Sequence, residues 1–257
     1  MCLILFAYNM HPSYRLILAA NRDEFYDRPT AAADFWKDHP HVLAGRDLKE
    51  KGTWLGVTTG GRFAAITNYR EPLSWMPVAP SRGKLVSRYL TGRARPGKYL
   101  EKISKDAMLF NGFNLLAGDR DELWGYSNRG DIQKLSAGIY GLSNHLLDTP
   151  WPKVQRGKKQ LSQALHLKGE ELEEALFAML ADRHVPPDQR LPDTGVGLEW
   201  EKVLSPIFIK SPDYGTRSST ILLIAKNRRV KLVEKVFNGE KLPWLTSRFS
   251  FLEGKIR

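Results

Sequence analysis

The sequence contains very little cysteine, since Cys2 is the single one among 257 residues. One cysteine excludes an internal disulfide and any zinc site built from several cysteines, and it fits a reducing compartment. The chain also lacks an apolar run of the roughly 18 residues that cross a bilayer. The apolar start, residues 2–7, lacks the basic flank of a signal peptide. We therefore expect a soluble, cytoplasmic protein.

Metal-binding patterns are missing as well. The six histidines are dispersed, and His39 and His41, which flank Pro40, do not have the spacing of a zinc site. We expect no bound metal and no required cofactor. Structural roles are the default for these histidines. His145, next to Asn144, is the one to test as an axial ligand of a haem iron.

Acidic residues are outnumbered, because 28 Asp and Glu stand against 39 Lys and Arg, which gives a formal charge of +11. Such a charge concentrates anions near the surface and favours phosphate or carboxylate ligands. The basic residues are scattered, as in Lys158-Lys159 and Arg228-Arg229, rather than gathered beside a known RNA-binding motif. Anionic small molecules are therefore the expected partners, and nucleic acid is not.

What the chain does have is ample apolar content, 42% of its residues, which suits one domain over residues 1–257. Residues 2–8 and 14–20 are almost continuously apolar and predict a hairpin covered on both faces. Further strands are expected at 54–57, 63–68, 113–117, 123–126, 132–135, 139–142, 219–225 and 230–237. Helices are expected at 83–91, 99–109, 151–167 and 170–181.

This order of strands, two helices, strands, two helices and strands has no βαβ alternation. Two stacked, mainly antiparallel sheets with helices on both outer faces satisfy it. The expected fold class is therefore α+β, a four-layer αββα sandwich.

Cys2 has the strongest chemical potential by position. If Met1 is removed, which the small side chain of Cys2 permits, the thiol and a free α-amine share one residue. An α-amine with a pKa near 8 takes the thiol proton, so nucleophile and base lie together. The alternative is a small buried apolar residue in a central strand.

Polar residues follow several predicted strands. Arg22 and Asp23 come directly after the second strand, where a cation would lower the thiol pKa. A surface ion pair in a turn is the alternative. Asn68, Asn144 and Arg217 stand beside strand ends, and amide donors suit an oxyanion hole, although single asparagines more often cap turns.

The run at residues 14–26, which contains Asn21-Arg22-Asp23-Glu24, resembles the signature of the transport-and-Golgi-organisation family. Other blocks are similar to that family in the same order: Gly52-Thr53-Trp54-Leu55-Gly56, Thr67-Asn68-Tyr69, Asn111-Gly112-Phe113-Asn114-Leu115, Tyr140-Gly141-Leu142-Ser143-Asn144, Thr149-Pro150-Trp151 and Tyr214-Gly215-Thr216-Arg217.

The family in turn resembles the N-terminal-nucleophile cysteine amidases, which include bile-salt hydrolase, penicillin V acylase and acid ceramidase. That resemblance implies an N-terminal-nucleophile hydrolase fold and a nucleophilic cysteine. The implied catalytic positions are Cys2, Arg22, Asp23, Asn68, Asn144 and Arg217. One departure is that two residues separate the arginine and the aspartate in those amidases, whereas Arg22 and Asp23 adjoin here.

The family is associated with haem trafficking and with binding of acyl-coenzyme A or lipid. The resemblance therefore implies a bulky, anionic, amphiphilic ligand, with haem as cargo first and acyl-coenzyme A next. Four tryptophans, Trp36, Trp54, Trp75 and Trp151, are either walls of a ligand cleft or part of the core. The alternative function is a cysteine amidase or thioesterase with Cys2 as nucleophile. Ligand contacts are expected from Asn21, Arg22, Asp23, Glu24, His145 and Arg217.

Overall fold

The apolar start of the chain is an internal strand of a sheet. In the computed structural model, which describes residues 2–239 and 242–254, β1 (Cys2–Tyr8) pairs with β2 (Tyr14–Phe25) on one side and with β10 (Gly138–Leu142) on the other. Both pairings are antiparallel. The predicted hairpin is confirmed, and the continuous burial of β1 from Leu3 onward explains why its sequence does not alternate.

The first sheet has the strand order β10-β1-β2-β11-β12-β13. Its remaining strands come from the end of the chain: β11 (Tyr214–Ala225), β12 (Arg229–Val236) and β13 (Leu245–Leu252). The long β11 pairs with β2 along almost its whole length, so segments about 200 residues apart lie side by side.

The second sheet is a meander in the order β3-β4-β5-β6-β7-β8-β9. Gly61, with φ of 79°, makes the tight turn between β5 and β6. The strands are β3 (Thr30–Phe35), β4 (Val42–Asp47), β5 (Leu55–Thr58), β6 (Phe63–Asn68), β7 (Phe113–Gly118), β8 (Leu123–Ser127) and β9 (Ile132–Lys134).

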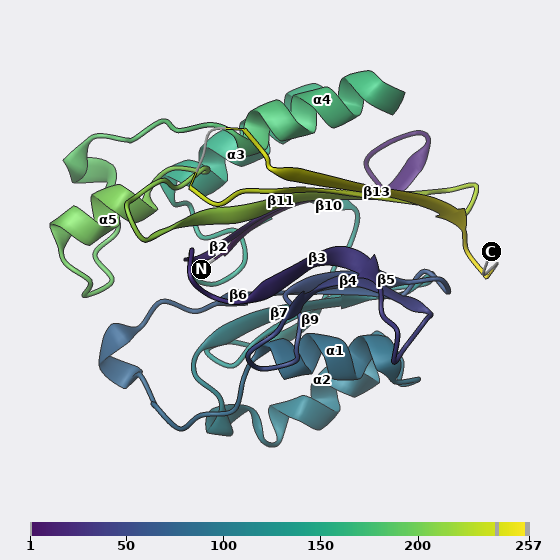
Figure 1. The fold of residues 1–257 in the computed structure, drawn as a ribbon, viewed down its shortest axis with the longest axis horizontal. Helices are drawn as coiled ribbons and strands as arrows, with labels where there is room; N and C mark the ends of the chain where they lie inside the picture. The colour runs from purple at the N-terminus through teal and green to yellow at the C-terminus, as the bar shows by residue number, and fades with distance from the viewer. Residues whose placement is uncertain (1, 240–241, 255–257) are drawn as a thin grey trace.

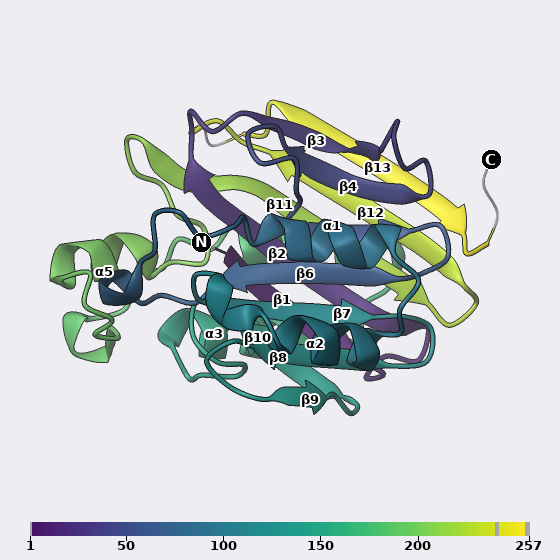
Figure 2. The same cartoon turned by 90° about the horizontal axis from the view of Figure 1, so that it is seen from below.

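Four layers result, as Figure 1 shows: α3 (Pro152–Ala164) and α4 (Gly169–Leu180) cover the first sheet, and α1 (Gly83–Thr91) and α2 (Pro96–Ser104) cover the second. The view from below shows α1 and α2 lying over the second sheet, roughly along the direction of β6 and β7 (Figure 2). Side chains of β1 alternate between two cores, with Leu3 and Leu5 toward α3 and α4 and with Ile4 and Phe6 between the sheets. The expected αββα sandwich is confirmed.

Several element boundaries differ from the sequence predictions. Asn21 to Glu24 do not follow β2 but continue it, because β11 and β1 supply backbone partners on both sides. Helix α2 begins at Pro96 rather than at the predicted residue 99, because the missing N–H of proline costs nothing in the first turn of a helix. The strands β3, β4 and β13 and helix α5 (Leu198–Leu204) were not predicted, since their apolar patterns are short or interrupted.

No helix in the described part of the chain is both long and apolar enough to span a membrane.

Candidate functional site

Alternation along β2 sends the polar run Asn21 to Glu24 to opposite faces of the first sheet. Neighbours in the run face the helices or the second sheet in turn, because strand side chains alternate. Arg22 lies directly opposite Cys2 in the register of β1 and β2. The strand therefore brings the predicted arginine to the predicted nucleophile on the face between the sheets.

A cavity of about 320 Å³ opens at this end of the sandwich. Cys2, Arg22, Asp23, Glu24 and Asn68 all line it. Five of the residues expected from the sequence are thus gathered from β1, β2 and β6.

The guanidinium of Arg22 is buried against the wall of this cavity. Only 6% of the residue is exposed, and its Cζ lies 4.4 Å from the centre of the Trp54 ring. Nη2 is 3.9 Å from Glu24 Oε2, but Nη1 has no hydrogen-bond partner among the described residues. A buried guanidinium donor without an acceptor is unusual and suits an anionic ligand.

A second arginine, Arg82, lines the same cavity and was not expected from the sequence. It follows a loop of small and apolar residues that gives no signal of a site. Its Nη1 donates to the carbonyl of Gly112 at 2.9 Å, and Cζ lies 5.8 Å from the centre of the Trp75 ring. Burial lowers the pKa of this guanidinium to about 10, so it remains a cation at neutral pH.

The Cys2 thiol is held protonated at neutral pH. Burial raises its pKa, and the nearby Asp23 carboxylate raises it further, while Arg22 acts in the opposite direction. An arginine opposite the thiol therefore does not by itself produce a thiolate. A base is needed for nucleophilic attack.

Asp23 is a fully enclosed carboxylate. Its Oδ1 accepts a hydrogen bond of 2.7 Å from Thr216 Oγ1 on β11. Burial raises its pKa, while the positive charge of Lys153 and the hydrogen bond from Thr216 oppose that effect. The hydrogen bond joins β2 to β11, and the charge of Lys153 couples Asp23 electrostatically to α3.

Lys153 was also missed by the sequence analysis. It lies in the first turn of α3 after Pro152, and its Nζ donates to the Leu204 carbonyl at 2.8 Å. Burial lowers the pKa of this ammonium to about 8. A cation in the first turn of a helix is unfavourable for the helix dipole. A lysine directly after the proline that starts the helix was therefore the signal by which the sequence could have pointed to Lys153.

Next to these groups lies a buried ion pair between Arg70, just after β6, and Glu201 on α5. Nη1 and Oε2 are 2.5 Å apart, and the two side chains are 5% and 3% exposed. The Arg70 guanidinium also lies 4.9 Å from the Trp151 ring centre. This pair ties the unpredicted helix α5 to the second sheet.

The two asparagines expected as amide donors take different places. Asn68 lines the cavity, whereas Asn144 is fully buried beside it. Asn144 Nδ2 donates to the Asn68 carbonyl at 3.0 Å, and its Oδ1 accepts from Arg70 at 3.4 Å. Asn144 therefore positions the end of β6.

Three other residues that the sequence predicts at the site, Asn21, Arg217 and His145, do not line the cavity. Asn21 anchors the helix layer, because its Nδ2 donates to the carbonyls of Leu180 and Ile207 at 2.8 Å each. Arg217 sits at a register shift of β11, and its Nη1 donates to the Phe25 carbonyl at 2.7 Å.

His145 is the third predicted site residue that does not line the cavity. Its Nε2 lies 2.7 Å from the Tyr69 hydroxyl and its Nδ1 2.9 Å from Thr149 Oγ1. Burial lowers the pKa of its imidazole. Both ring nitrogens are therefore already engaged in hydrogen bonds within the protein.

Within residues 2–239 and 242–254, no three His, Cys, Asp or Glu side chains gather closely enough to hold a metal ion.

The architecture matches solved structures with an N-terminal-nucleophile hydrolase-like fold. The Caenorhabditis elegans N-acylethanolamine-hydrolyzing acid amidase ortholog superposes with a TM-score of 0.52 at 12% identity, covering 86% of this chain and 92% of that one. The C2A mutant of the Clostridium perfringens conjugated bile acid hydrolase gives 0.51 at 7% identity, with 98% of both chains covered. At such identities the likeness defines the fold class.

Sequence comparison defines the family. The model of the family described as Transport and Golgi organisation 2 matches residues 1–239. A Transport and Golgi organization protein 2 homolog from Bos taurus is 40% identical over 274 residues, covering 98% of this chain and 99% of the relative. The Drosophila melanogaster Transport and Golgi organization protein 2 is 30% identical, with 93% of each chain covered. The chain belongs to the Transport and Golgi organisation 2 family.

Proposed function

We propose that the chain binds a bulky amphiphile with an anionic group in the cavity beside Cys2. The observation that carries this proposal is Arg22 Nη1, a buried donor that lacks a hydrogen-bond partner within the described residues. A carboxylate or phosphate of the ligand supplies that acceptor, and Arg82 adds a positive charge to the same wall. The wall also holds Arg28 and Lys49 and four carboxylates, those of Asp23, Glu24, Asp47 and Glu50, so the proposal depends on this buried donor of Arg22 rather than on the net charge of the wall. Trp54 and Trp75 provide apolar surface for the body of the ligand.

Haem is the first ligand to test and acyl-coenzyme A the second. Cys2 is the only cysteine, histidine or methionine among the described residues that line the cavity. Both ring nitrogens of His145 are engaged, so the proposal assigns iron ligation to the sulfur of Cys2. Because burial raises the thiol pKa, thiolate ligation strengthens as the pH rises.

Titration of haem into the protein tests this proposal. We expect a shifted Soret band that Cys2→Ala loses and that Arg22→Gln weakens at least about tenfold, since a charge-assisted hydrogen bond is removed. His145→Ala and Arg95→Gln serve as controls. Arg95 is an exposed arginine paired with Asp121, so its loss should leave the affinity unchanged.

The outcomes separate the two ligands. A wild-type protein that shifts no Soret band removes haem, and the same variants are then titrated with an acyl-coenzyme A by calorimetry. If Arg22→Gln and Arg95→Gln bind either ligand as wild type does, the cavity is not the ligand site.

A second candidate is a cysteine amidase or thioesterase, favoured by the shared position of Cys2 and Asn68 on one cavity. In this mechanism a free α-amine on Cys2 takes the thiol proton and the sulfur attacks the carbonyl carbon. The Asn68 amide stabilises the oxyanion, and the ammonium returns its proton to the leaving amine or thiol. Water then hydrolyses the acyl-cysteine.

Intact mass spectrometry tests the precondition, because a chain that begins at Met1 has no α-amine on Cys2. Turnover of a simple N-acyl amide and of an acyl thioester is then measured for wild type, Cys2→Ala and Asn68→Ala. Loss of turnover in Cys2→Ala is the expected result. Unchanged turnover in that variant ends the hydrolase proposal.

A further inference from the structure

The loop between β6 and α1 holds apolar side chains out in solvent. Leu73 is 95% exposed, Val78 96% and Trp75 59%. Residues 72–81, which we call the apolar loop, contain no charged side chain. An uncharged loop with three large apolar side chains left this exposed is a candidate interaction surface.

The apolar loop is also a wall of the site cavity. Trp75, Pro77 and Pro80 line that cavity together with Cys2 and Arg22. Figures 1 and 2 both place this loop and α5 at the end of the sandwich where β1 begins. Trp200 on α5 adds a side chain that is 48% exposed. Whatever covers the apolar loop therefore lies next to the cavity.

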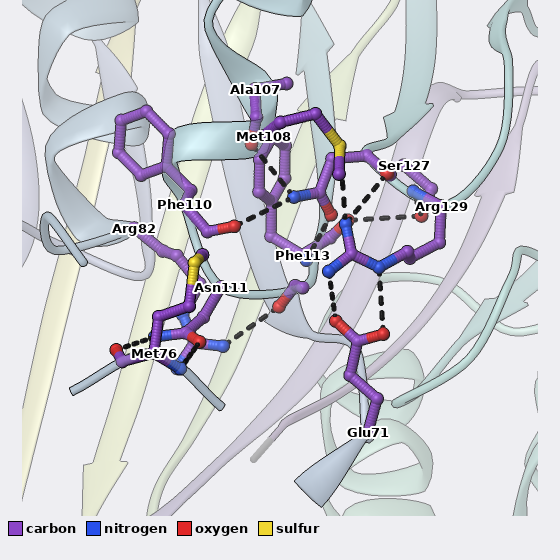
Figure 3. Close-up of polar contacts among 12 residues, drawn as sticks. Glu71, Met76, Arg82, Ala107, Met108, Phe110, Asn111, Phe113, Ser127 and Arg129 are labelled. Atoms are coloured by element: carbon purple, nitrogen blue, oxygen red, sulfur yellow. Dashed lines mark hydrogen bonds and ion pairs between the residues drawn. The ribbon is translucent and has the colours of Figure 1, made fainter. Parts of the chain in front are cut away.

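The loop is fixed in place rather than loosely attached, as Figure 3 shows for its base. Arg129 binds Glu71 through two contacts, Nε to Oε2 at 2.8 Å and Nη2 to Oε1 at 2.5 Å. The buried side chain of Asn111 accepts from the Met76 backbone N–H at 2.8 Å and donates to the Met76 carbonyl at 2.9 Å. Arg82 closes the loop by its bond to Gly112. Such anchoring lowers the ordering cost of any contact that the loop makes.

We propose that the apolar loop inserts Leu73, Trp75 and Val78 into the surface of a lipid bilayer and so brings the cavity to the membrane interface. Headgroup and upper acyl regions accept apolar side chains without shape complementarity, and Trp prefers that boundary. A stable protein interface needs roughly 800 Å² on each partner, which three side chains on one loop do not supply. The proposal rests on the proposed function only in naming what passes into the cavity.

Vesicle flotation of the full chain tests the proposal without any ligand. Wild type is compared with Leu73→Glu/Val78→Glu on phosphatidylcholine vesicles and on vesicles that also contain phosphatidylglycerol. We expect the double variant to partition into vesicles more than about tenfold less than wild type, since charges replace two apolar side chains that would enter the bilayer. Met10→Glu is the matched control, because Met10 is 45% exposed and follows β1 at the opposite end of the sandwich.

Insertion and electrostatic adsorption give different results with salt. Insertion of apolar side chains persists at about 0.5 M NaCl, whereas attraction of a basic protein to anionic lipid is screened there. Three results overturn the proposal: the wild-type protein does not float, it floats no better than the double variant, or this salt releases it from the vesicles. Self-association that the double variant abolishes, without flotation, assigns the loop to a second copy of the chain instead.

The two proposals fail separately. Ligand titration without vesicles should give the double variant the wild-type affinity, while Arg22→Gln should float as wild type does. Circular dichroism and denaturant unfolding check that each variant is folded.

Discussion

The polar groups at the site end of the first sheet differ between its two faces. On the helix side, Asn21 is bonded to Leu180, Ile207 and Ser219. Asp23 accepts from Thr216 on the same face but also reaches the lining of the cavity. On the side facing the second sheet, Cys2 and Arg22 line a cavity, and one guanidinium nitrogen lacks a partner within the described chain. Hydrogen-bonded groups hold the architecture together, whereas the cavity side is available to a ligand. One four-residue run serves both purposes because a strand alternates.

The comparison predicts its largest effect for Glu201, a buried and hydrogen-bonded group on α5 that does not line the site cavity. Its carboxylate pairs with Arg70 and also accepts from Thr194 Oγ1 at 2.5 Å. Glu201→Ala leaves a buried guanidinium without its partner, and we expect a loss of about 3–5 kcal/mol in the free energy of unfolding. Denaturant titration measures it.

The control for that experiment is Glu199→Ala on the same helix, whose side chain is 86% exposed. It should change the unfolding free energy by less than about 0.5 kcal/mol. Equal effects of the two variants would show that α5 stabilises the protein through its helix propensity and not through the buried ion pair.

Lys153 gives a pH-dependent test. Its pKa is lowered from the ordinary 10.5 to about 8 by burial, so between these values the unfolded chain binds more protons than the folded one. Below pH 8 the burial of the ammonium therefore lowers the unfolding free energy by about 3 kcal/mol, and this penalty is relieved as the pH rises through the window.

The Lys153→Met variant isolates this contribution. The raised pKa values of Cys2 and of the buried tyrosines act in the opposite direction in the same range, and they are common to both proteins. The difference between wild type and variant should therefore shift in favour of wild type from pH 8 to pH 10. If the difference in unfolding free energy between wild type and Lys153→Met does not change with pH, the buried lysine does not lose its proton in this range.

Adjacent residues on opposite faces sharpen the comparison further. Asn21→Ala leaves two buried carbonyls and one hydroxyl without their partner, and we expect a loss of about 2–3 kcal/mol in the free energy of unfolding with ligand affinity retained. For Arg22→Gln we expect the reverse: little change in the free energy of unfolding and a lower affinity for the ligand. Thermal unfolding and ligand titration on both variants check this, and similar profiles for the two would remove the distinction between the faces.

The smallest expected effect is on thiol reactivity. Because burial raises the pKa of Cys2 and Arg22 opposes the rise, alkylation by iodoacetamide should be slow at neutral pH and slower still in Arg22→Gln. Cys2 is the single cysteine, so intact mass reports the reaction directly. Faster alkylation in the variant would mean that Arg22 acts by blocking access rather than by charge.

Much of the fold was predictable because its strongest patterns are local. The unbroken apolar runs of β1 and β2 and the glycine turn before β6 appear in short windows of sequence. β13 could not be predicted, since its burial alternates between exposed and half-buried side chains. The extension of β2 through Glu24 could not be predicted either, because polar residues in an internal strand depend on a partner about 190 residues away.

The site was predictable in part for the same reason. Cys2, Arg22, Asp23 and Asn68 stand at strand ends or carry a family motif, and the structure places them on one cavity. Arg82, Lys153 and Glu201 carry no local pattern and were missed. Asn144 and His145 were predicted to lie at the site, but which of their atoms are already bonded depends on Asn68 and Tyr69.

The sequence by itself determined the alternating layers of strands and helices and the family, because hydrophobic periodicity and linear motifs are properties of neighbouring residues. Only the tertiary structure decided which polar groups bond to one another and which line the cavity. Pairing of β2 with β11, and of α5 with the end of β6, joins residues that are far apart along the chain. Burial and hydrogen bonding at those junctions, which no sequence window contains, set the charge and availability of each side chain.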